Sequence, residues 1–503
     1  MGLAALPAIE ISALLAFFFG RTLLDHTPGF INDAIDYWLE GQAFAHAGFH
    51  AGYFTIDEKP APASFSHFGS HGPFFPMLHG TLGRLLGWHP YSIPFFHLGF
   101  LTAALLFFTR RTSPDRQGRV LVVLGLATFW PLHFLLPTSL QEGLHLAVAV
   151  VLATMLRPLL EGREPSAAVR VVLPAVLIAA CLVRPSWGLL LPPVFVLLLG
   201  AGSRRNQILA AAVGVVLCIA LVLTFDHMAA PFGRHGFFFV KVARLQEGAA
   251  TLADRVLVNA IGFVDGGTAL EVRNRFLVLG LALASGALAA RAGARPEHAF
   301  HAYNLGSILL ATLLTYVFGS WADYRILAAP LLLTALLLAS SRAVAARRVA
   351  AFVVLAQLAS VGPFIAAFPS LRETYRYDTA RIETFGAAAR GALVFDGRQD
   401  AWCNTLVSVN FPYFYPEMVA LPPGIGVTML FGPPGATRLR SRYVLLDPED
   451  LRRWTMGRPT VAGAGPDRIS VSVGDWLSLR LKPLAKTPVG QLYQNLDAHC
   501  PGG

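Results

Sequence analysis

Charged residues are scarce in this chain. They make up 14% of its 503 residues, whereas hydrophobic residues make up 54%. A soluble globular protein has about a quarter charged residues, so a single soluble domain is excluded. An intrinsically disordered chain is excluded as well, because so much apolar side chain would not remain solvated. The composition therefore predicts an integral membrane protein.

Lysine is scarcer still. Four lysines, Lys59, Lys241, Lys482 and Lys486, stand among 40 basic residues, so almost all of the positive charge is arginine. The arginines lie between apolar runs. That distribution is typical of a protein that contacts membrane lipids, and no nucleic-acid partner is expected.

Long apolar runs recur from residue 4 to residue 368 and predict about eleven transmembrane helices. The predicted spans are 4–24, 93–109, 120–136, 143–160, 169–183, 187–201, 207–225, 275–291, 303–319, 326–341 and 348–368. The first is interpreted as a retained helix, not a cleaved signal peptide, because no basic region precedes it. The two spans on either side of Arg184-Pro185 are also compatible with one broken element.

The arginines of the short loops predict the orientation in the membrane. They are concentrated in alternate loops, at Arg110, Arg111, Arg116 and Arg119, at Arg157, Arg163 and Arg170, at Arg204 and Arg205, at Arg291 and Arg295, and at Arg342, Arg347 and Arg348. By the positive-inside rule these loops and the N-terminus are cytoplasmic. We expect the cytoplasmic (inner) membrane of a bacterium, with residues 369–503 in the periplasm.

Three polar segments are then extracytoplasmic, namely the loops 25–92 and 226–274 and the tail 369–503. The tail contains runs typical of strands, at 392–395, 405–409, 427–431, 443–446 and 469–481, and runs typical of helices, at 381–390 and 448–454. The predicted fold class is an α-helical integral membrane protein. Its transmembrane domain comprises residues 1–368, and a small extracytoplasmic α/β domain comprises residues 369–503.

The chain contains four cysteines and no C-x-x-C pair, which excludes the usual zinc and redox spacings. Cys181 and Cys218 fall inside apolar runs. Cys403 and Cys500 fall in the predicted outer domain, where disulfides persist. We therefore predict a Cys403–Cys500 disulfide, with two unpaired thiols as the alternative.

The most polar outer segment begins directly after the first apolar run. Asp33, Asp36 and Tyr37 lie at its start, where a short tether would hold a carboxylate close to the membrane surface. A catalytic role for Asp33 and a role as the cap of a surface helix are equally compatible with this position. His67 and His71 have a metal-ligand spacing, but Gly69, Gly72 and Pro73 argue against a regular helix there.

Two isolated arginines lie at predicted outer helix ends, against the general charge bias. They are Arg184, before Pro185, and Arg325, after Asp323 and Tyr324. A guanidinium offers a planar, permanently charged fork that binds phosphate oxygens. The alternative is an arginine that extends along the interface to reach water.

Three stretches together resemble the GT-C glycosyltransferases that use polyprenyl-phosphate sugars, in the branch of protein O-mannosyltransferases and lipid A aminoarabinose transferases (family 39). Asp33 and Tyr37 match the Asp-x-x-x-Tyr start of the family's first outer loop. The stretch from His71 to Gly87 is similar to its Lys-Pro-Pro-Leu to Leu-Phe-Gly segment. The stretch from Tyr324 to Pro330 is similar to the Arg-Tyr-x-x-Pro start of a late helix. The resemblance covers most of the chain.

The resemblance implies a GT-C-like fold and an inverting glycosyltransferase. Such an enzyme moves a sugar from a polyprenyl-phosphate donor to an acceptor hydroxyl, on a lipid, glycan or protein, at the outer face of the membrane. The implied site residues are Asp33 as catalytic base; Asp36, Tyr37, Glu142 and Tyr324 as positioning residues; and Arg325, Arg184, Lys59 and His71 at the donor phosphate.

The chain departs from the family in two places. His71 stands where the family often has lysine, for which Lys59 is a candidate substitute. The metal-dependent oligosaccharyltransferase relatives have an Asp-x-Glu pair in the next outer loop, where this chain has only Glu142. We therefore predict no metal site and no other cofactor. The alternative functions are a transporter or flippase of lipid-linked sugars and a non-catalytic partner in envelope-glycan assembly.

Overall fold

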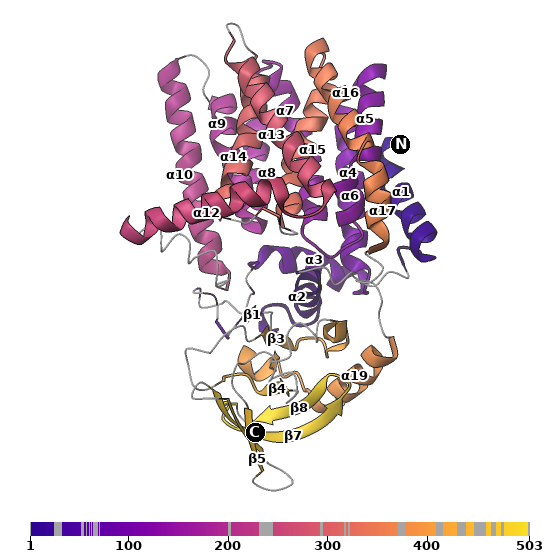
Figure 1. The fold of residues 1–503 in the computed structure, drawn as a ribbon, viewed down its shortest axis with the longest axis vertical. Helices are drawn as coiled ribbons and strands as arrows, with labels where there is room; N and C mark the ends of the chain where they lie inside the picture. Colours follow the sequence, from indigo (N-terminus) through magenta and orange to yellow (C-terminus); the bar gives the residue numbers. More distant parts are fainter. Residues whose placement is uncertain are drawn as a thin grey trace. The chain divides into compact units, whose positions relative to one another are not determined.

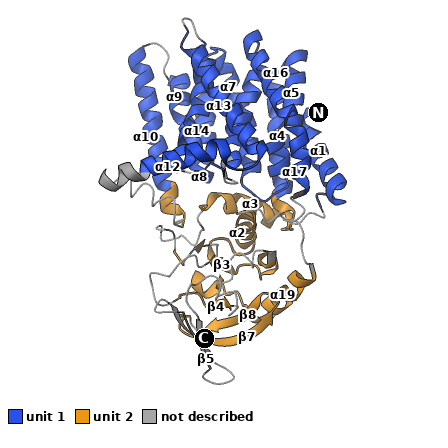
Figure 2. Cartoon of the chain, viewed as in Figure 1, with its two compact units in different colours: residues 1–26, 94–224, 234–373 blue, residues 27–93, 225–233, 374–503 orange. Residues whose placement is uncertain are grey.

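The computed structural model describes residues 2–24, 33–51, 55–56, 58–59, 61, 63, 69, 71–199, 203–230, 245–291, 295–315, 318–319, 322–370, 379–408, 416–429, 439–446, 459–463, 469–473 and 477–500. The chain divides by its contacts into two compact units (Figure 2). Unit 1 comprises Met1–His26, Pro94–Thr224 and Arg234–Glu373, and unit 2 comprises Thr27–Ile93, Phe225–Gly233 and Thr374–Gly503.

Unit 1 is helical (Figure 1). Its elements are α1 (Gly2–Phe19), most of α4 (Ser92–Thr112), α5 (Arg116–Thr128), α6 (Trp130–Leu135), α7 (Glu142–Leu160), α8 (Ala167–Val183), the 3-10 turn η2 (Pro185–Leu190), α9 (Leu191–Leu199), most of α10 (Arg204–Met228), α12 (Leu245–Asp265), α13 (Ala269–Ala289), α14 (Pro296–Thr315), α15 (Ala322–Ser340), α16 (Val344–Leu358), α17 (Val361–Ala367) and η3 (Phe368–Ser370).

Six helical segments among the described residues are long and apolar enough to cross a membrane, which identifies an integral membrane protein. They are α1, α4, α7, α10, α13 and the segment Val344–Ala367 formed by α16 and α17. Three shorter apolar segments lie at Ala167–Val183, Pro185–Leu199 and Tyr324–Ser340. The total of eleven spans therefore remains a prediction.

Three predicted spans are not continuous α-helices. The span 120–136 divides at Phe129, where Pro131 opens α6. The span 187–201 consists of the end of η2 followed by α9, and the span 348–368 is interrupted between α16 and α17. Proline lacks a backbone N–H and clashes with the carbonyl four residues earlier, so it ends or begins helices inside apolar runs. The hydrophobicity of the sequence alone does not reveal these interruptions of the helices.

Helix α15 lies at the centre of unit 1 and contacts α5, α7, α14 and α16. Its leucines Leu327, Leu331 and Leu337 are completely buried. The amide of Asn304 on α14 donates to the Pro330 carbonyl oxygen and to the Thr334 hydroxyl, each at 3.0 Å. The pairing satisfies polar groups that would otherwise be unpaired in an apolar interior.

Unit 2 begins with two packed helices, α2 (Ala34–Ala47) and α3 (Phe74–Leu86), with the short turn η1 (Gly48–His50) after α2. Gly80 allows the two helices to approach closely, since a Cβ atom there would lie 2.7 Å from the Phe44 Cβ. Helix α3 begins directly after Pro73. The expectation that no regular helix forms near His71 is therefore wrong from Phe74 onward; His67 lies outside the described residues.

The sheet of unit 2 has eight strands in the order β1-β3-β2-β4-β8-β7-β6-β5. These are β1 (Thr55–Ile56), β2 (Thr405–Ser408), β3 (Gly426–Met429), β4 (Tyr443–Leu446), β5 (Pro459–Gly463), β6 (Ile469–Val473), β7 (Leu477–Thr487) and β8 (Gly490–Asn495). The first four strands pair in parallel, and the remaining pairs are antiparallel. The 3-10 turns η4 (Ala401–Asn404) and η5 (Pro416–Ala420) flank β2, and α19 (Thr379–Ala392) contacts η5 and β7.

Several strand predictions require correction. Residues 392–395 form no strand, because α19 extends to Ala392, and the predicted run 469–481 contains two antiparallel strands, β6 and β7. Residues 448–454 lie outside the described residues.

The strand β1 comes from the loop 25–92, which the sequence did not connect with the tail. Glu58 fastens it, since its carboxylate accepts the backbone N–H groups of Arg440 at 2.7 Å and Ser441 at 2.8 Å.

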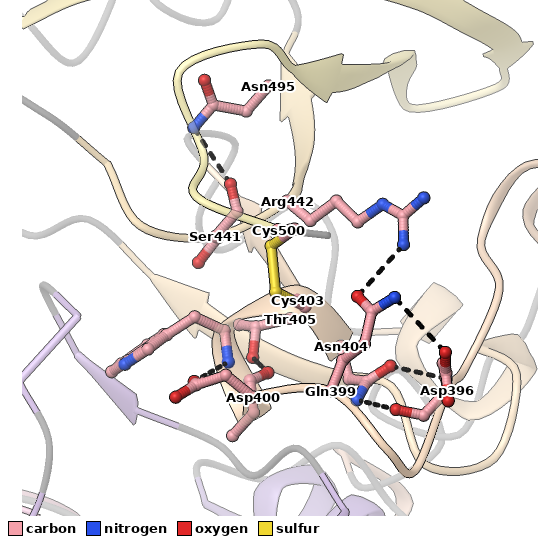
Figure 3. The surroundings of a disulfide bond; sticks show 12 residues. Asp396, Gln399, Asp400, Cys403, Asn404, Thr405, Ser441, Arg442, Asn495 and Cys500 are labelled. Atoms are coloured by element: carbon pink, nitrogen blue, oxygen red, sulfur yellow. Dashed lines mark hydrogen bonds between the residues drawn. A yellow bond between two sulfur atoms is a disulfide. The ribbon is translucent and has the colours of Figure 1, made fainter. Parts of the chain in front are cut away.

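Cys403 and Cys500, which the sequence pairs, form a disulfide with a Cα–Cα distance of 5.7 Å (Figure 3). It joins η4 to the chain end that follows β8. Asn495 reinforces this end of the sheet, because its amide donates to the carbonyl oxygens of Leu439 and Ser441. Cys181 and Cys218 are free thiols.

Candidate functional site

Unit 1 contains a buried cluster of three charged side chains from three elements. Glu142 is the first residue of α7, Arg184 precedes η2, and Arg325 lies in the first turn of α15. Arg325 Nε donates to Glu142 Oε1 at 2.9 Å, and Arg184 Nη2 donates to the same oxygen. The sequence predicted a role for each of these residues, and the structure brings them together.

This cluster carries more positive than negative charge. Two guanidinium groups face one carboxylate, which leaves a net charge of +1 on the three side chains. The side chains of Arg325 and Glu142 are 5% and 1% exposed, and that of Arg184 is 16% exposed. Guanidinium groups gathered at one place can also bind the oxygens of a phosphate. Glu142 holds both arginines in place while neutralising only one.

A small pocket opens beside the cluster. Its lining includes Arg184, His145, Trp187, Asn304 and Pro330, and it has about 20 Å³ of water-accessible space. Trp187 Nε1 donates to His145 Nδ1 at 3.0 Å, and His145 Nε2 lies 3.5 Å from Gln141 Oε1. The tryptophan donor requires an unprotonated Nδ1, so the remaining ring proton is on Nε2. This pairing fixes the turn that carries Arg184.

Sequence reasoning did not single out His145 or Trp187. A signal existed, because His145 is three residues after Glu142 and residues at that spacing share a helix face. His97 is also buried, and its ring packs against Gly143, next to Glu142. Its contact with this part of α7 is set by tertiary packing and has no sequence signal.

Tyr324 precedes Arg325 and is buried. Its ring lies against those of Trp130 and Phe134, with centroid distances of 5.4 Å and 5.7 Å. The contacts place Tyr324 in an aromatic cluster with α6. Its role in positioning a substrate stays a prediction.

In unit 2, the predicted base Asp33 lies beside His71. Asp33 occupies the N-cap position of α2, yet its side chain makes no capping hydrogen bond. Instead Asp33 Oδ2 lies 3.9 Å from His71 Nε2, and the Asp33 side chain is 25% exposed. The ring of Tyr37 lies 4.3 Å from that of His71. Three of the residues that the sequence singled out therefore share one place, although His71 was predicted at the donor phosphate.

Two further carboxylates follow on the same helix and are buried. Asp36 is 3% exposed and Glu40 is completely buried. Burial, with the neighbouring charges of Asp33 and Glu40, raises the pKa of Asp36 well above its usual range. Burial likewise raises the pKa of Glu40, and the backbone of Gly69 offsets this in part. Asp36 Oδ1 has no hydrogen-bond partner within the described part of the chain.

The other predicted site residue, Lys59, is exposed and lies next to Glu58, at the edge of the sheet in unit 2. Among the described residues, no group of three or more histidine, cysteine, aspartate or glutamate side chains could hold a metal ion.

No protein-family model matches the chain. No curated protein sequence matches it significantly. Among solved structures, the chain is similar to the archaeal oligosaccharyltransferase AglB from Archaeoglobus fulgidus in complex with an inhibitory peptide and a dolichol-phosphate. The identity is 13% and the TM-score 0.49, over 94% of this chain and 74% of that one. A likeness of this degree does not establish a family.

Proposed function

We propose that this protein is an inverting membrane glycosyltransferase that uses a polyprenyl-phosphate sugar. The observation that carries the proposal is the cluster in which Glu142 holds two guanidinium groups, those of Arg184 and Arg325, at one place. Apolar helices supply a surface for the lipid tail of such a donor, and the two arginines supply cations for its phosphate. The motif resemblance described above supports the same reaction class.

The chemistry requires stabilisation of the leaving phosphate. The acceptor hydroxyl oxygen forms a bond to the anomeric carbon as the bond from that carbon to the phosphate oxygen breaks. Polyprenyl phosphate leaves with the electron pair of the broken bond. Arg325 and Arg184 meet the charge that develops on it, and they are already oriented by Glu142. Lys59 stays a predicted helper at the phosphate.

The chemistry also requires a base for the hydroxyl proton, and Asp33 is our choice. Its carboxylate is 25% exposed, so an acceptor hydroxyl can approach it as a base requires. Asp36, the nearest competitor, is buried, and its raised pKa favours the protonated carboxyl group, which cannot accept a proton from an external hydroxyl. The contact with His71 supports a place for that histidine beside the base, with Tyr37 packed against it.

The proposal predicts which product disappears from the cell. Envelope glycans and polyprenyl-phosphate sugars are analysed by mass spectrometry in cells without the gene and in cells complemented with wild type, Asp33→Asn or Arg325→Ala. Wild type should restore a sugar decoration, and both variants should fail to do so and accumulate donor. The exposed glutamate of α19, changed by Glu383→Gln, is the matched control and should behave as wild type.

The same experiment tests the alternative functions. Full complementation by Asp33→Asn would contradict the role of Asp33 as base, and full complementation by Arg325→Ala would contradict the phosphate site. If purified wild type moves the donor across vesicles without transferring its sugar, the protein is a flippase rather than a transferase.

A further inference from the structure

Helix α12 lies in the segment 226–274, which the sequence assigned to an outer loop. It is a 21-residue helix in unit 1 and contacts α13 and α14. It runs across the long axes of these two helices (Figure 1). A helix of this length has the reach to span a membrane, so its crosswise course needs a reason.

Two polar anchors fix α12 at the end of α14. Asn259 is buried; its amide donates to the Leu313 carbonyl oxygen at 2.5 Å, and its Oδ1 accepts the Phe318 N–H at 2.7 Å. Leu313 lies in the last turn of α14, and Phe318 follows that helix. The contacts hold α12 at the level where α14 ends, not along its length.

The second anchor closes the C-terminal end of α12. The last carbonyl groups of a helix have no partners within the helix. The buried guanidinium of Arg275 on α13 donates to the carbonyl oxygens of Gly262 at 2.5 Å, Phe263 at 2.7 Å and Gly266. Gly262 also lies against the backbone of Phe318, since a Cβ atom there would be 2.5 Å from that carbonyl oxygen. One side of α12 therefore packs against other helices of unit 1, α13 and α14.

The opposite side of α12 is apolar and uncovered. At 3.6 residues per turn, one half of its circumference carries the side chains of Leu252, Val256, Leu257, Ile261 and Val264, and Phe263 at its border packs against Phe276 and Phe318. Leu257, Ile261 and Val264 are 61%, 59% and 61% exposed. The other half carries Asn259, Arg255, Asp254 and Asp265, with one exposed apolar residue, Val258. We call the first set the apolar arc.

We propose that α12 is an in-plane membrane helix whose apolar arc is covered by the acyl chains of the bilayer. The arc continues into the surface of a spanning helix, because Phe263 packs edge-to-face on Phe276 of α13 at 5.2 Å, and Phe276 is itself 48% exposed. The exposed apolar surface of a membrane span faces lipid, so the continuous surface on α12 faces lipid too. Asp254 and Asp265 then lie at the headgroup edge.

The proposal concerns lipid contact alone and does not depend on the proposed reaction. Its test uses the full-length protein in lipid nanodiscs, with Cys181 and Cys218 replaced by alanine and one cysteine introduced for a nitroxide label. The labelled positions are Val256, Leu257 and Val264 on the apolar arc, and Asp254 and Asp265 on the polar border of the arc beside Ile261. A label at Val216 of α10, which is 68% exposed on a predicted span, gives the reference for lipid.

For each nitroxide label, the rate of collision with oxygen, which dissolves in lipid, is compared with the rate of collision with a water-soluble nickel chelate. Labels on the apolar arc should favour oxygen, as the label at Val216 does, and labels at Asp254 and Asp265 should favour nickel. Preference for nickel at all five positions would show that the arc faces water. Protection of the arc from both reagents would show that protein covers it. Either result would overturn the proposal. An arc variant that does not elute as wild type is replaced by Leu252→Cys, on the same arc.

Discussion

The polar clusters around Glu142 in unit 1 and around Asp36 and Glu40 in unit 2 accommodate buried carboxyl groups in opposite ways. In unit 1, Glu142 is matched by two arginines within hydrogen-bond distance. In unit 2, Asp36 and Glu40 are as deeply buried, and burial raises the pKa of each instead. In unit 1 the side chains keep their charges as ion pairs. The arrangement in unit 2 favours neutral carboxyl groups and makes that unit sensitive to pH.

A second difference lies in how each unit is held together. The described parts of unit 1 pack apolar helices and contain only free thiols, whereas unit 2 is closed by a disulfide across 97 residues. Cys500→Ala should lower the free energy of unfolding of unit 2 by up to about 4–5 kcal/mol, on a chain-entropy treatment of a loop this long. Pulse proteolysis in urea, with fragments assigned by mass spectrometry, measures it. Equal loss of protection in unit 1 would show that the units do not unfold separately.

Removal of the shared carboxylate should have the next largest effect. Glu142→Ala removes the carboxylate that Arg184 and Arg325 share, and breaking a buried ion pair by removing one partner costs about 3–5 kcal/mol. Thermal unfolding in detergent should show the loss, and added inorganic phosphate should restore part of it by taking the place of the carboxylate. Glu383→Gln, at an exposed site, should show neither effect. If Glu142→Ala were as stable as wild type, the cluster would be hydrated and would not attract an anion.

The hydrogen bond between Trp187 and His145 gives a further test of how the polar groups of unit 1 contribute to stability. His145→Leu leaves the buried indole N–H of Trp187 unpaired and should cost about 1–3 kcal/mol. His145→Asn presents an acceptor where Nδ1 was and should cost less. In a Trp187→Phe background the two substitutions should have nearly equal effects, because the donor is gone. Thermal unfolding of the single and double variants gives the comparison; equal costs in the wild-type background would contradict the hydrogen bond.

Within any single pH unit, Glu40 provides an effect of only about 1.4 kcal/mol, and it tests how unit 2 accommodates buried carboxyl groups. Unfolded Glu40 releases its proton near the ordinary glutamate pKa, while the folded residue retains it to higher pH. The folded state then binds more protons, so the stability of wild type falls as pH rises between those two pKa values. The slope is about 1.4 kcal/mol per pH unit for one group. Glu40→Gln should remove the share of this slope that Glu40 contributes and leave the share of Asp36, as read from unfolding midpoints between pH 5 and pH 8. Glu383→Gln should leave the slope unchanged.

The helices of unit 1 were largely predictable, because a long apolar run can satisfy its backbone polar groups in a membrane only as a helix. Segments such as 143–160 and 207–225 lie within α7 and α10. The breaks at Phe129 and before α17 were missed, since proline and local backbone geometry interrupt helices without lowering hydrophobicity. Helix α12 was missed because its apolar residues occupy only one face and never form a long run.

The sequence determined the membrane character of this chain, the reactive residue types and the pairing of Cys403 with Cys500. These depend on composition and on local order, which a chain carries with it. Tertiary structure alone decided that Glu142 holds both Arg184 and Arg325, and that Asp33 lies beside His71 instead of capping α2. It also decided that the strand at Thr55 completes a sheet whose other strands come from the C-terminal part of the chain. Contacts between segments that are distant in the sequence produce no periodic residue pattern, because each contacting residue is selected for its surroundings in three dimensions.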